Sequence, residues 1–125
     1  MPVEPGLAAQ VELTVSEADT ALAMRSGDVP VLATPRIVAL CEEASVKAVA
    51  GQLAEGETTV GHSIQLDHVA PTRVGGRVRA EVTLQKVAGR RLTFTVSVTD
   101  PHGLIAAGII TRVVVDVDRF LDTAN

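Results

Sequence analysis

The chain has 125 residues, of which 46% are hydrophobic and 21% are charged, so its length and composition fit one globular domain and exclude a disordered chain. Lys and Arg total 11 and Asp and Glu total 15, which gives a formal net charge of −4, and the chain has two Phe and no Trp or Tyr. An acidic domain with so few aromatic side chains lacks both the positive charge and the stacking surfaces of a nucleic-acid-binding protein.

The first part of the chain predicts a short strand followed by helical turns. Residues 10–15 alternate polar and apolar side chains, which is typical of a half-buried strand. Residues 16–19 have the Ser and the acidic residues of a helix start, and residues 26–28 mark a break. Thr34-Pro35 then begins the longest helix, which we expect to run to about Ala50, because Thr is a preferred N-cap and Pro suits the first helical turn.

The helix that begins at Thr34 is apolar over more than half of its circumference. At 100° per residue, Glu42 projects from the edge of the apolar sector, whereas Glu43 lies on the opposite flank beside Lys47. We therefore expect the helix to be wrapped by the rest of the chain and Glu43 to be solvated. The sector comprises a central stripe and one flank: Ile37, Leu40, Cys41, Ala44 and Ala48, then Val38, Ser45 and Val49.

The second half of the chain predicts four strands. Alternation places Val60, Ile64, Leu66 and Ala70 on one face of a strand that follows Gly56. Two further alternating segments, residues 77–85 and 92–98, are separated by a turn at Ala88-Gly89. A strong turn signal at residues 100–103 precedes a last strand, residues 104–117, which is apolar enough to be covered on both faces. A strand, a helix and a four-stranded meander predict one α+β domain over residues 1–125, an antiparallel sheet with a helix on one face.

Several sequence features concern the compartment. No stretch approaches about 18 uninterrupted apolar residues, so we expect no membrane span. Residues 1–6 contain neither a basic segment nor an apolar run, so we expect no secretory signal. The single cysteine, Cys41, excludes an intramolecular disulfide and a multi-cysteine zinc site, and its position in the helix predicts a small buried side chain. These features together predict a soluble, cytoplasmic protein.

Glu42 and a histidine are the main candidates for chemistry. A carboxylate at the edge of an apolar sector either reaches water or is a functional group whose environment shifts its pKa. His68 and His62 share the parity of the apolar strand positions, and the pattern does not separate them from each other or from a structural histidine. His102 lies in a turn, where solvation is the expected state.

Thr34 and Gly61 are the remaining candidates. N-capping alone explains a Thr before Pro, but a hydroxyl at a helix start also lies where backbone N–H groups converge, which suits a developing oxyanion. Gly61 would weaken a strand unless a ligand or another backbone must come close. The sequence thus predicts a carboxylate, a histidine, a hydroxyl and a strand glycine near one helix–sheet interface.

With these residues in place, the chain resembles the hotdog-fold thioesterases, specifically the fluoroacetyl-CoA thioesterase-like group. The resemblance covers nearly the whole chain and is strongest in residues 31–35 (Val-Leu-Ala-Thr-Pro), 40–44 (Leu-Cys-Glu-Glu-Ala) and 56–61 (Gly-Glu-Thr-Thr-Val-Gly). The spacing of Thr34, Glu42 and His68, eight and then 26 residues, is similar to that of the catalytic Thr, Glu and His of the family.

The resemblance implies a fold, an assembly and an activity. The fold is a long antiparallel sheet wrapped around a central helix, and two subunits join their sheets edge to edge as a homodimer. The sequence leaves open whether such dimers pair into a tetramer. The activity is hydrolysis of a small or medium acyl-CoA thioester without a cofactor or a metal ion.

The resemblance also implies the site residues. Glu42 would be the nucleophile or general base, His68 the proton shuttle and Thr34 its hydrogen-bond partner. Thr34 and Glu42 of one protomer would meet His68 of the partner subunit at the dimer interface. The backbone N–H of Gly61 would help to hold the thioester carbonyl, and Arg112 would contact the substrate.

Two positions depart from the family pattern. Members selective for fluoroacetyl-CoA carry an aromatic lid before the catalytic Thr, whereas Phe94 and Phe120 both follow Thr34, so we expect no selectivity for fluorinated acyl groups. Many relatives read Gly-x-His-x-Arg near the end of the chain, where this chain retains Gly108 and Arg112 but has Ile110 in place of His.

Other functions and contacts remain open from the sequence. A non-catalytic acyl-CoA or acyl-carrier binding protein would use the same scaffold, whereas a purely structural oligomerisation domain would leave Glu42 and His68 unexplained. A hotdog dehydratase is an alternative enzyme on the same scaffold, but the spacing of the Thr, Glu and His residues favours hydrolysis. The arginines that can reach CoA phosphates are not ranked by the sequence: Arg36, Arg73, Arg77, Arg79, Arg90, Arg91 and Arg112.

Overall fold

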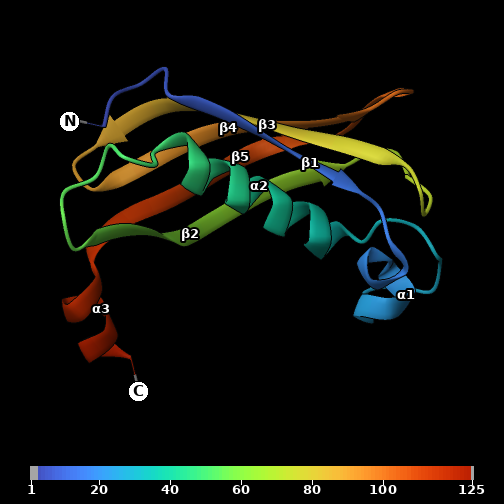
Figure 1. The fold of residues 1–125 in the computed structure, drawn as a ribbon, viewed down its shortest axis with the longest axis horizontal. Coiled ribbons are helices and arrows are strands. Elements are labelled where there is room, and N and C mark those ends of the chain that lie inside the picture. The colour runs from blue at the N-terminus through green and yellow to red at the C-terminus, as the bar shows by residue number, and fades with distance from the viewer. Residues whose placement is uncertain (1–2, 125) are drawn as a thin grey trace.

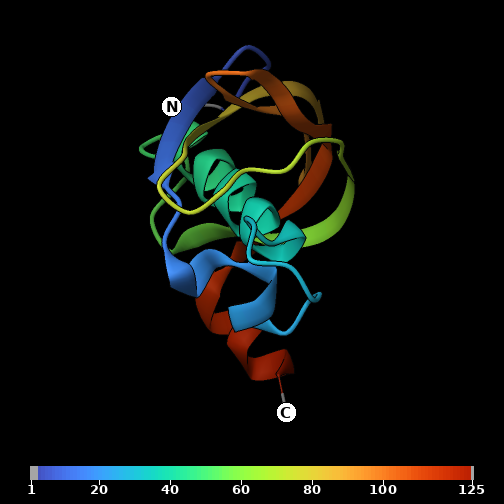
Figure 2. The same cartoon turned by 90° about the vertical axis from the view of Figure 1, so that its right-hand side faces the viewer.

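A long helix, α2 (Thr34–Ala48), lies against one face of a five-stranded antiparallel sheet that curves around it (Figures 1 and 2). The computed structural model describes residues 3–124. The strand order is β1-β3-β4-β5-β2. The strands are β1 (Ala8–Thr14), β2 (Glu57–His68), β3 (Arg77–Ala88), β4 (Arg91–Asp100) and β5 (Gly103–Asp116). The short helices are η1 (Glu17–Asp19), α1 (Ala21–Met24) and α3 (Val117–Thr123).

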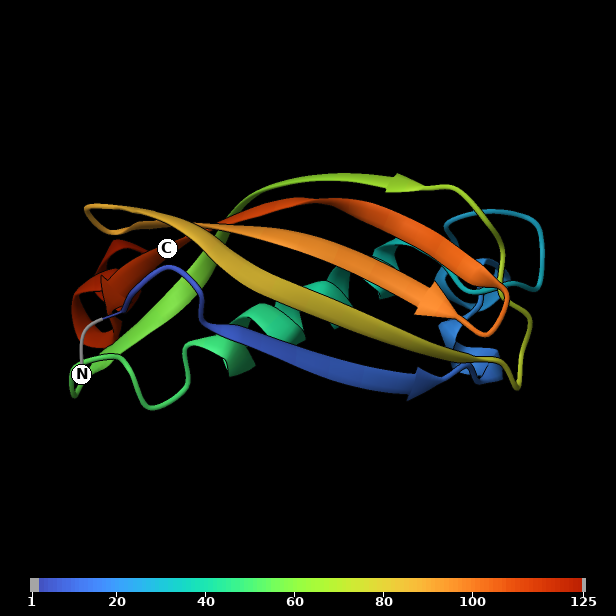
Figure 3. The same ribbon diagram turned by 90° about the horizontal axis from the view of Figure 1, so that it is seen from above.

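The sheet confirms the predicted strands but not the predicted meander. β3, β4 and β5 are joined by hairpins, whereas β2 pairs with β5 and forms one edge of the sheet. Residues 69–76 therefore cross the end of the molecule before β3 begins (Figure 3). Backbone contacts fix this crossing, because Leu32 N–H donates to the Thr72 carbonyl at 2.8 Å and Val31 bridges to Arg73. The expected four-strand meander is wrong at β2.

The core forms where the apolar stripe of α2 meets the inner face of the sheet. The predicted stripe is confirmed, since all five of its residues are buried, and Phe94 of β4 is fully buried opposite them. Full burial of each large apolar side chain contributes about 1.5–3 kcal/mol to stability. The last strand was expected to be covered on both faces, but its outer face is open within residues 3–124, because Ile109 of β5 is 44% exposed.

A β-bulge at His62 decides which side chains of β2 face the helix. Gly61 pairs with Arg112 of β5 and Ser63 with Thr111, so His62 has no partner in the register. Cross-strand partners share a face of the sheet. The inner face of β2 therefore carries Thr59 and Gly61 before the bulge and Ile64, Leu66 and His68 after it, opposite β5 residues that are mostly buried. The expectation that Val60 shares this face with Ile64 is wrong, because the extra residue reverses the parity.

No helix within residues 3–124 is long and apolar enough to span a membrane.

The C-terminal helix α3 was not among the predicted elements. It begins after Asp116, whose carboxylate accepts from Arg119 N–H at 3.1 Å and so caps the helix.

Gly108 permits β2 and β5 to approach closely beside His68. A Cβ at this position would overlap the carbonyl oxygen of Gln65 and lie 2.9 Å from the Cα of Leu66, both atoms of the β2 backbone. A strand glycine at such an approach has a packing role.

We expect Gly108→Ala to lower the free energy of unfolding by about 1–3 kcal/mol, because the β2 backbone must move to admit the methyl group. Chemical denaturation measures this loss. Ala107→Ser, a change at the adjacent outward-facing position, is the control and should be nearly neutral. Equal stability of Gly108→Ala and the wild type would show that β2 is not held this tightly.

Candidate active site

Thr34 and His68 form the first part of the candidate site, and they do so within one chain. The Thr34 hydroxyl and the His68 Nδ1 are 2.8 Å apart. Thr34 is the first residue of α2 and His68 the last of β2, so the crossing of the chain after β2 brings the two together. The expectation that Thr34 meets His68 of the partner subunit is therefore wrong for this contact.

The predicted capping role of Thr34 is also not observed. The N-cap of α2 is Ala33, which has no side-chain capping bond, and Thr34 lies one residue inside the helix. Its hydroxyl is thus available to the imidazole. This removes the structural explanation that the sequence offered for Thr34.

His68 has one ring nitrogen without a protein partner. Its Nε2 is buried and has no hydrogen bond within residues 3–124. Buried polar atoms are nearly always satisfied, so such an atom is a candidate for contact with a ligand. The tautomer in which Thr34 donates to Nδ1 leaves a proton on Nε2.

Glu42 and Arg112 form the second part of the candidate site. The Glu42 Oε2 accepts from Arg112 Nη1 at 3.3 Å, and the Glu42 side chain is 34% exposed, as its position at the edge of the apolar sector predicts. Glu43 is exposed, as expected. A Cβ at Gly61 would lie 2.7 Å from Glu42 Oε2, so the carboxylate lies directly over the glycine. This close approach explains a glycine inside β2.

Arg112 is a buried cation with most of its donors in use. Its Nε donates to the Thr59 hydroxyl and its Nη2 to the Thr59 carbonyl, both at 2.9 Å. Burial lowers the pKa of the Arg112 guanidinium, and the charge and hydrogen bond of Glu42 partly offset this effect. Sequence reasoning missed Thr59; its separation of two residues from Gly61 was the available signal.

The bulge separates the two histidines that the sequence left equivalent. His62 is at the bulge and exposed, whereas His68 follows it on the inner face, half-buried. His102 is exposed in the β4–β5 turn, as expected. Burial raises the pKa of the Cys41 thiol to about 11, so this side chain is a neutral core residue.

The two parts of the site are separated along the helix. Thr34 and Glu42 are eight residues apart on α2, a rise of about 12 Å. No hydrogen bond joins the Thr34–His68 pair to the Glu42–Arg112 pair within residues 3–124. The described part of the chain also contains no group of three or more His, Cys, Asp or Glu side chains arranged to hold a metal ion.

The start of α2, and with it Thr34, is anchored by Asp19. The Asp19 carboxylate accepts from Arg36 Nε at 2.9 Å and from the backbone and hydroxyl of Ser16 at 2.8 and 2.9 Å. The Asp19 carbonyl accepts from Ala33 N–H at 2.9 Å. Burial alone would raise the pKa of Asp19, but the hydrogen bonds from Ser16 and the Arg36 guanidinium outweigh this effect and hold the pKa below its ordinary value.

A helix held in a curved antiparallel sheet of this order is a hotdog fold. The chain is similar to a hot-dog-like protein from Thermanaerovibrio acidaminovorans, at 28% identity and a TM-score of 0.87 over 94% of this chain and 87% of that one. It is also similar to the fluoroacetyl-CoA thioesterase FlK, at 30% identity and a TM-score of 0.91 over 98% of this chain and 95% of that one.

Sequence comparison gives the family. Residues 15–118 match the model of the fluoroacetyl-CoA-specific thioesterases, and the chain belongs to this family. The fluoroacetyl-CoA thioesterase of Streptantibioticus cattleyicolor is 38% identical over 90 residues. That match covers 72% of this chain and 65% of the relative, slightly less than two thirds of its length. The resemblance inferred from the sequence is thus confirmed.

We expect Asp19→Asn to lower the free energy of unfolding by about 1–2 kcal/mol at neutral pH, through loss of the charge-assisted bonds. A carboxyl whose folded pKa is depressed stabilises the fold above its unfolded pKa, and this contribution disappears as the pH falls through the folded value. The difference between Asp19→Asn and the wild type should therefore shrink below about pH 4. Denaturation curves from pH 7 to pH 2.5 measure it; a difference that does not change with pH would contradict the assigned cause.

Proposed function

We propose that this protein hydrolyses acyl-CoA thioesters, with Thr34, Glu42 and His68 as its catalytic residues. The observation that carries the proposal is the hydrogen bond between Thr34 and His68 Nδ1, which leaves Nε2 buried and without a partner. Membership of a thioesterase family supports the same reaction.

Hydrolysis of a thioester requires activation of the attacking group, protonation of the leaving thiolate and stabilisation of the charge on the carbonyl oxygen. Glu42 activates the attack on the carbonyl carbon, either as the nucleophile or as the base that deprotonates water. His68 delivers a proton to the departing CoA thiolate, and Thr34 orients its ring through Nδ1. The backbone N–H of Gly61 contributes a dipole toward the carbonyl oxygen, where negative charge develops.

A homodimer unites the two parts of the site. β2 is an edge strand, and its residues 61–65 are exposed on both faces, with Ile64 38% exposed. In an antiparallel two-fold pairing of two β2 edges centred on residue 65, with His62 left unpaired by the bulge, residue 68 opposes residue 61 of the partner subunit, and both lie on the inner face. Thr34 and His68 of one protomer would then face Glu42 of the partner subunit. This arrangement revises the division of residues implied by the sequence.

We expect Glu42→Gln and His68→Ala each to lower kcat/KM for acyl-CoA hydrolysis by at least about 100-fold, because each removes a proton-transfer or attacking group. Mixing the two inactive variants after reversible dissociation should restore about a quarter of wild-type activity, because half of the randomly formed dimers are mixed and each of these has one complete site. Release of free thiol from acyl-CoA esters measures the rate.

The matched control is a mixture of Thr34→Val with His68→Ala. These two residues belong to the same half of a site, so their mixed dimer has no complete site and should stay inactive. Recovery in this control, or none in the Glu42–His68 mixture, would overturn the proposed assembly. A folded wild type that binds acyl-CoA but releases no thiol would favour the non-catalytic binding protein instead.

The acyl group is proposed to be small or medium and not specifically fluorinated. No aromatic side chain precedes Thr34, and the segment before it contributes aliphatic residues, of which Leu22 is 50% and Val29 54% exposed. The cytoplasmic location and the pairing of dimers into tetramers stay predictions.

A pocket formed in part by the segments that precede Thr34 and follow His68 is proposed to hold the nucleotide end of CoA. Its volume is about 590 Å³, and its lining includes Val31, Thr72, Arg73, Arg77, Asp100 and His102. Val31 is three residues from Thr34 and Arg73 is five from His68, so the extended chain places them at most about 11 and 18 Å away. The pantetheine arm of CoA spans such a distance.

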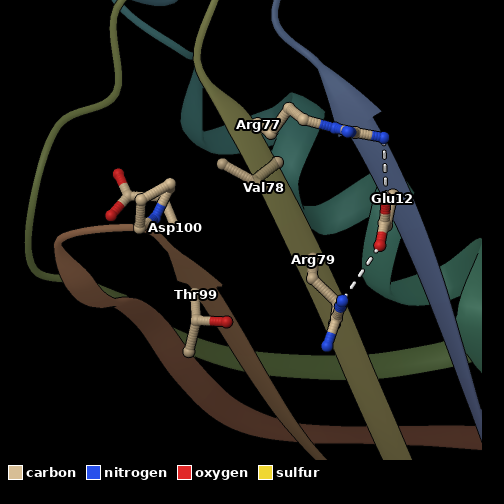
Figure 4. Close-up of a pocket in the computed structure, with 7 residues that line it drawn as sticks. Glu12, Arg77, Val78, Arg79, Thr99 and Asp100 are labelled. Atoms are coloured by element: carbon tan, nitrogen blue, oxygen red, sulfur yellow. Dashed lines mark hydrogen bonds and ion pairs between the residues drawn. The ribbon is translucent and has the colours of Figure 1, made fainter.

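Arg73 is the arginine best placed for the CoA phosphates. It is exposed at this pocket and its side chain has no hydrogen bond or ion pair within residues 3–124. Arg77 and Arg79 instead reach across to Glu12 of β1 at 3.0 and 3.1 Å (Figure 4). Asp100 lines the pocket too, but its carboxylate is occupied by the Thr72 hydroxyl and the His102 N–H.

We expect Arg73→Glu to raise KM for an acyl-CoA about 5- to 10-fold, equivalent to about 1–1.4 kcal/mol, by repelling the phosphates. KM for the matching acyl-pantetheine, which lacks the nucleotide, should change less than about 2-fold, since no phosphate is present. Arg91→Glu makes the same charge change on an exposed arginine at the far end of the sheet and is the control. An equal effect of Arg73→Glu on both substrates would contradict this placement.

A further inference from the structure

The guanidinium of Arg112 is fixed by hydrogen bonds to protein groups through each of its nitrogens. All three of its guanidinium nitrogens donate to protein groups: Nε and Nη2 to Thr59, and Nη1 to Glu42. The Arg112 side chain is 8% exposed. Because Arg112 and Thr59 lie on the inner faces of paired strands, these bonds fix the guanidinium against the sheet.

Glu42 is consequently held by one of its two oxygens. Oε2 accepts from Arg112 and lies over Gly61, where a Cβ would leave it no room. Oε1 has no hydrogen bond within residues 3–124. A carboxylate that is anchored through one oxygen keeps the other in a defined place for reaction.

We propose that Arg112 is a positioning residue that acts through Glu42, and that Thr59 in turn holds Arg112. The inference rests on the proposed thioester hydrolysis and replaces the expected contact of Arg112 with the substrate. The chain of contacts from Thr59 to Arg112 to Glu42 orients the carboxylate so that Oε1 is the atom that attacks or takes the proton. Arg112 itself does not touch the reacting atoms.

The test separates positioning from substrate binding by the kinetic constant that changes. Thr59→Val removes the hydroxyl while keeping the shape of the side chain, and should lower kcat about 10-fold with KM within about 2-fold of the wild type. Thr59→Ser retains the hydroxyl and should restore most of kcat. Arg112→Met should lower kcat about 100-fold, and Arg112→Lys should recover only part of it, because one ammonium cannot reproduce three directed bonds.

Thr58→Val is the matched control, because Thr58 is the adjacent residue of β2 and pairs with Val115 on the outer face. It should leave kcat and KM unchanged. A rise in KM without loss of kcat in Arg112→Met would assign Arg112 to substrate binding and overturn the proposal. Unchanged kcat in Thr59→Val would also overturn it, even where Arg112→Met fails to fold.

A crystal structure of Thr59→Val gives a readout that does not depend on activity. The Glu42 carboxylate should lose its single position over Gly61, whereas in Thr58→Val it should keep it. A Glu42 carboxylate that stays fixed in Thr59→Val would contradict the positioning role. Failure of the proposed function is a different result: no wild-type hydrolysis of any acyl-CoA, with the displacement of Glu42 still observed.

Discussion

The register of β2 against β5 is the constraint on which the candidate site depends. Gly61 and His68 are seven residues apart, so in a regular strand they would point to opposite faces of the sheet. The extra residue at His62 turns both toward α2. The same register pairs Thr59 with Val114, where the Thr59 hydroxyl accepts from Arg112. Arg112 in turn donates to the Glu42 carboxylate. One inserted residue thus decides which side chains of the strand face the candidate site.

The second constraint is the crossing of the chain between β2 and β3. Residues 69–76 run past the segment before α2, and their backbone contacts at Leu32 and Val31 bring the end of β2 to the start of the helix. The Thr34–His68 hydrogen bond is a product of this topology. Asp19 anchors the same helix start from the other side through Arg36 and Ala33. The helix start is therefore defined by contacts with segments that are distant in sequence.

The sequence predicted what depends on local periodicity. The stripe of α2, the bounds of the strands to within a few residues, and the different environments of Glu42 and Glu43 all follow from side-chain spacing. The bulge was not predictable, because a single inserted residue leaves alternation intact on both sides of it. For the same reason His62 was left equivalent to His68. Thr59 was missed for a different reason, because it precedes the bulge and shares the face of Gly61 by simple alternation. The position of β2 beside β5 depends on long-range pairing, which turn signals do not encode.

The unpaired edge of β2 also has a consequence for unwanted pairing between chains. Along this edge the backbone of β2 is not paired with another strand of the sheet, and the side chain of Ile64 beside it is exposed. Such an edge recruits any strand that meets it, including strands from misfolded chains. The side chains along this edge therefore have two requirements: they must permit the proposed pairing with a second copy and disfavour pairing with other strands. A substitution at the β2 edge would therefore affect both self-association and resistance to amyloid-like aggregation.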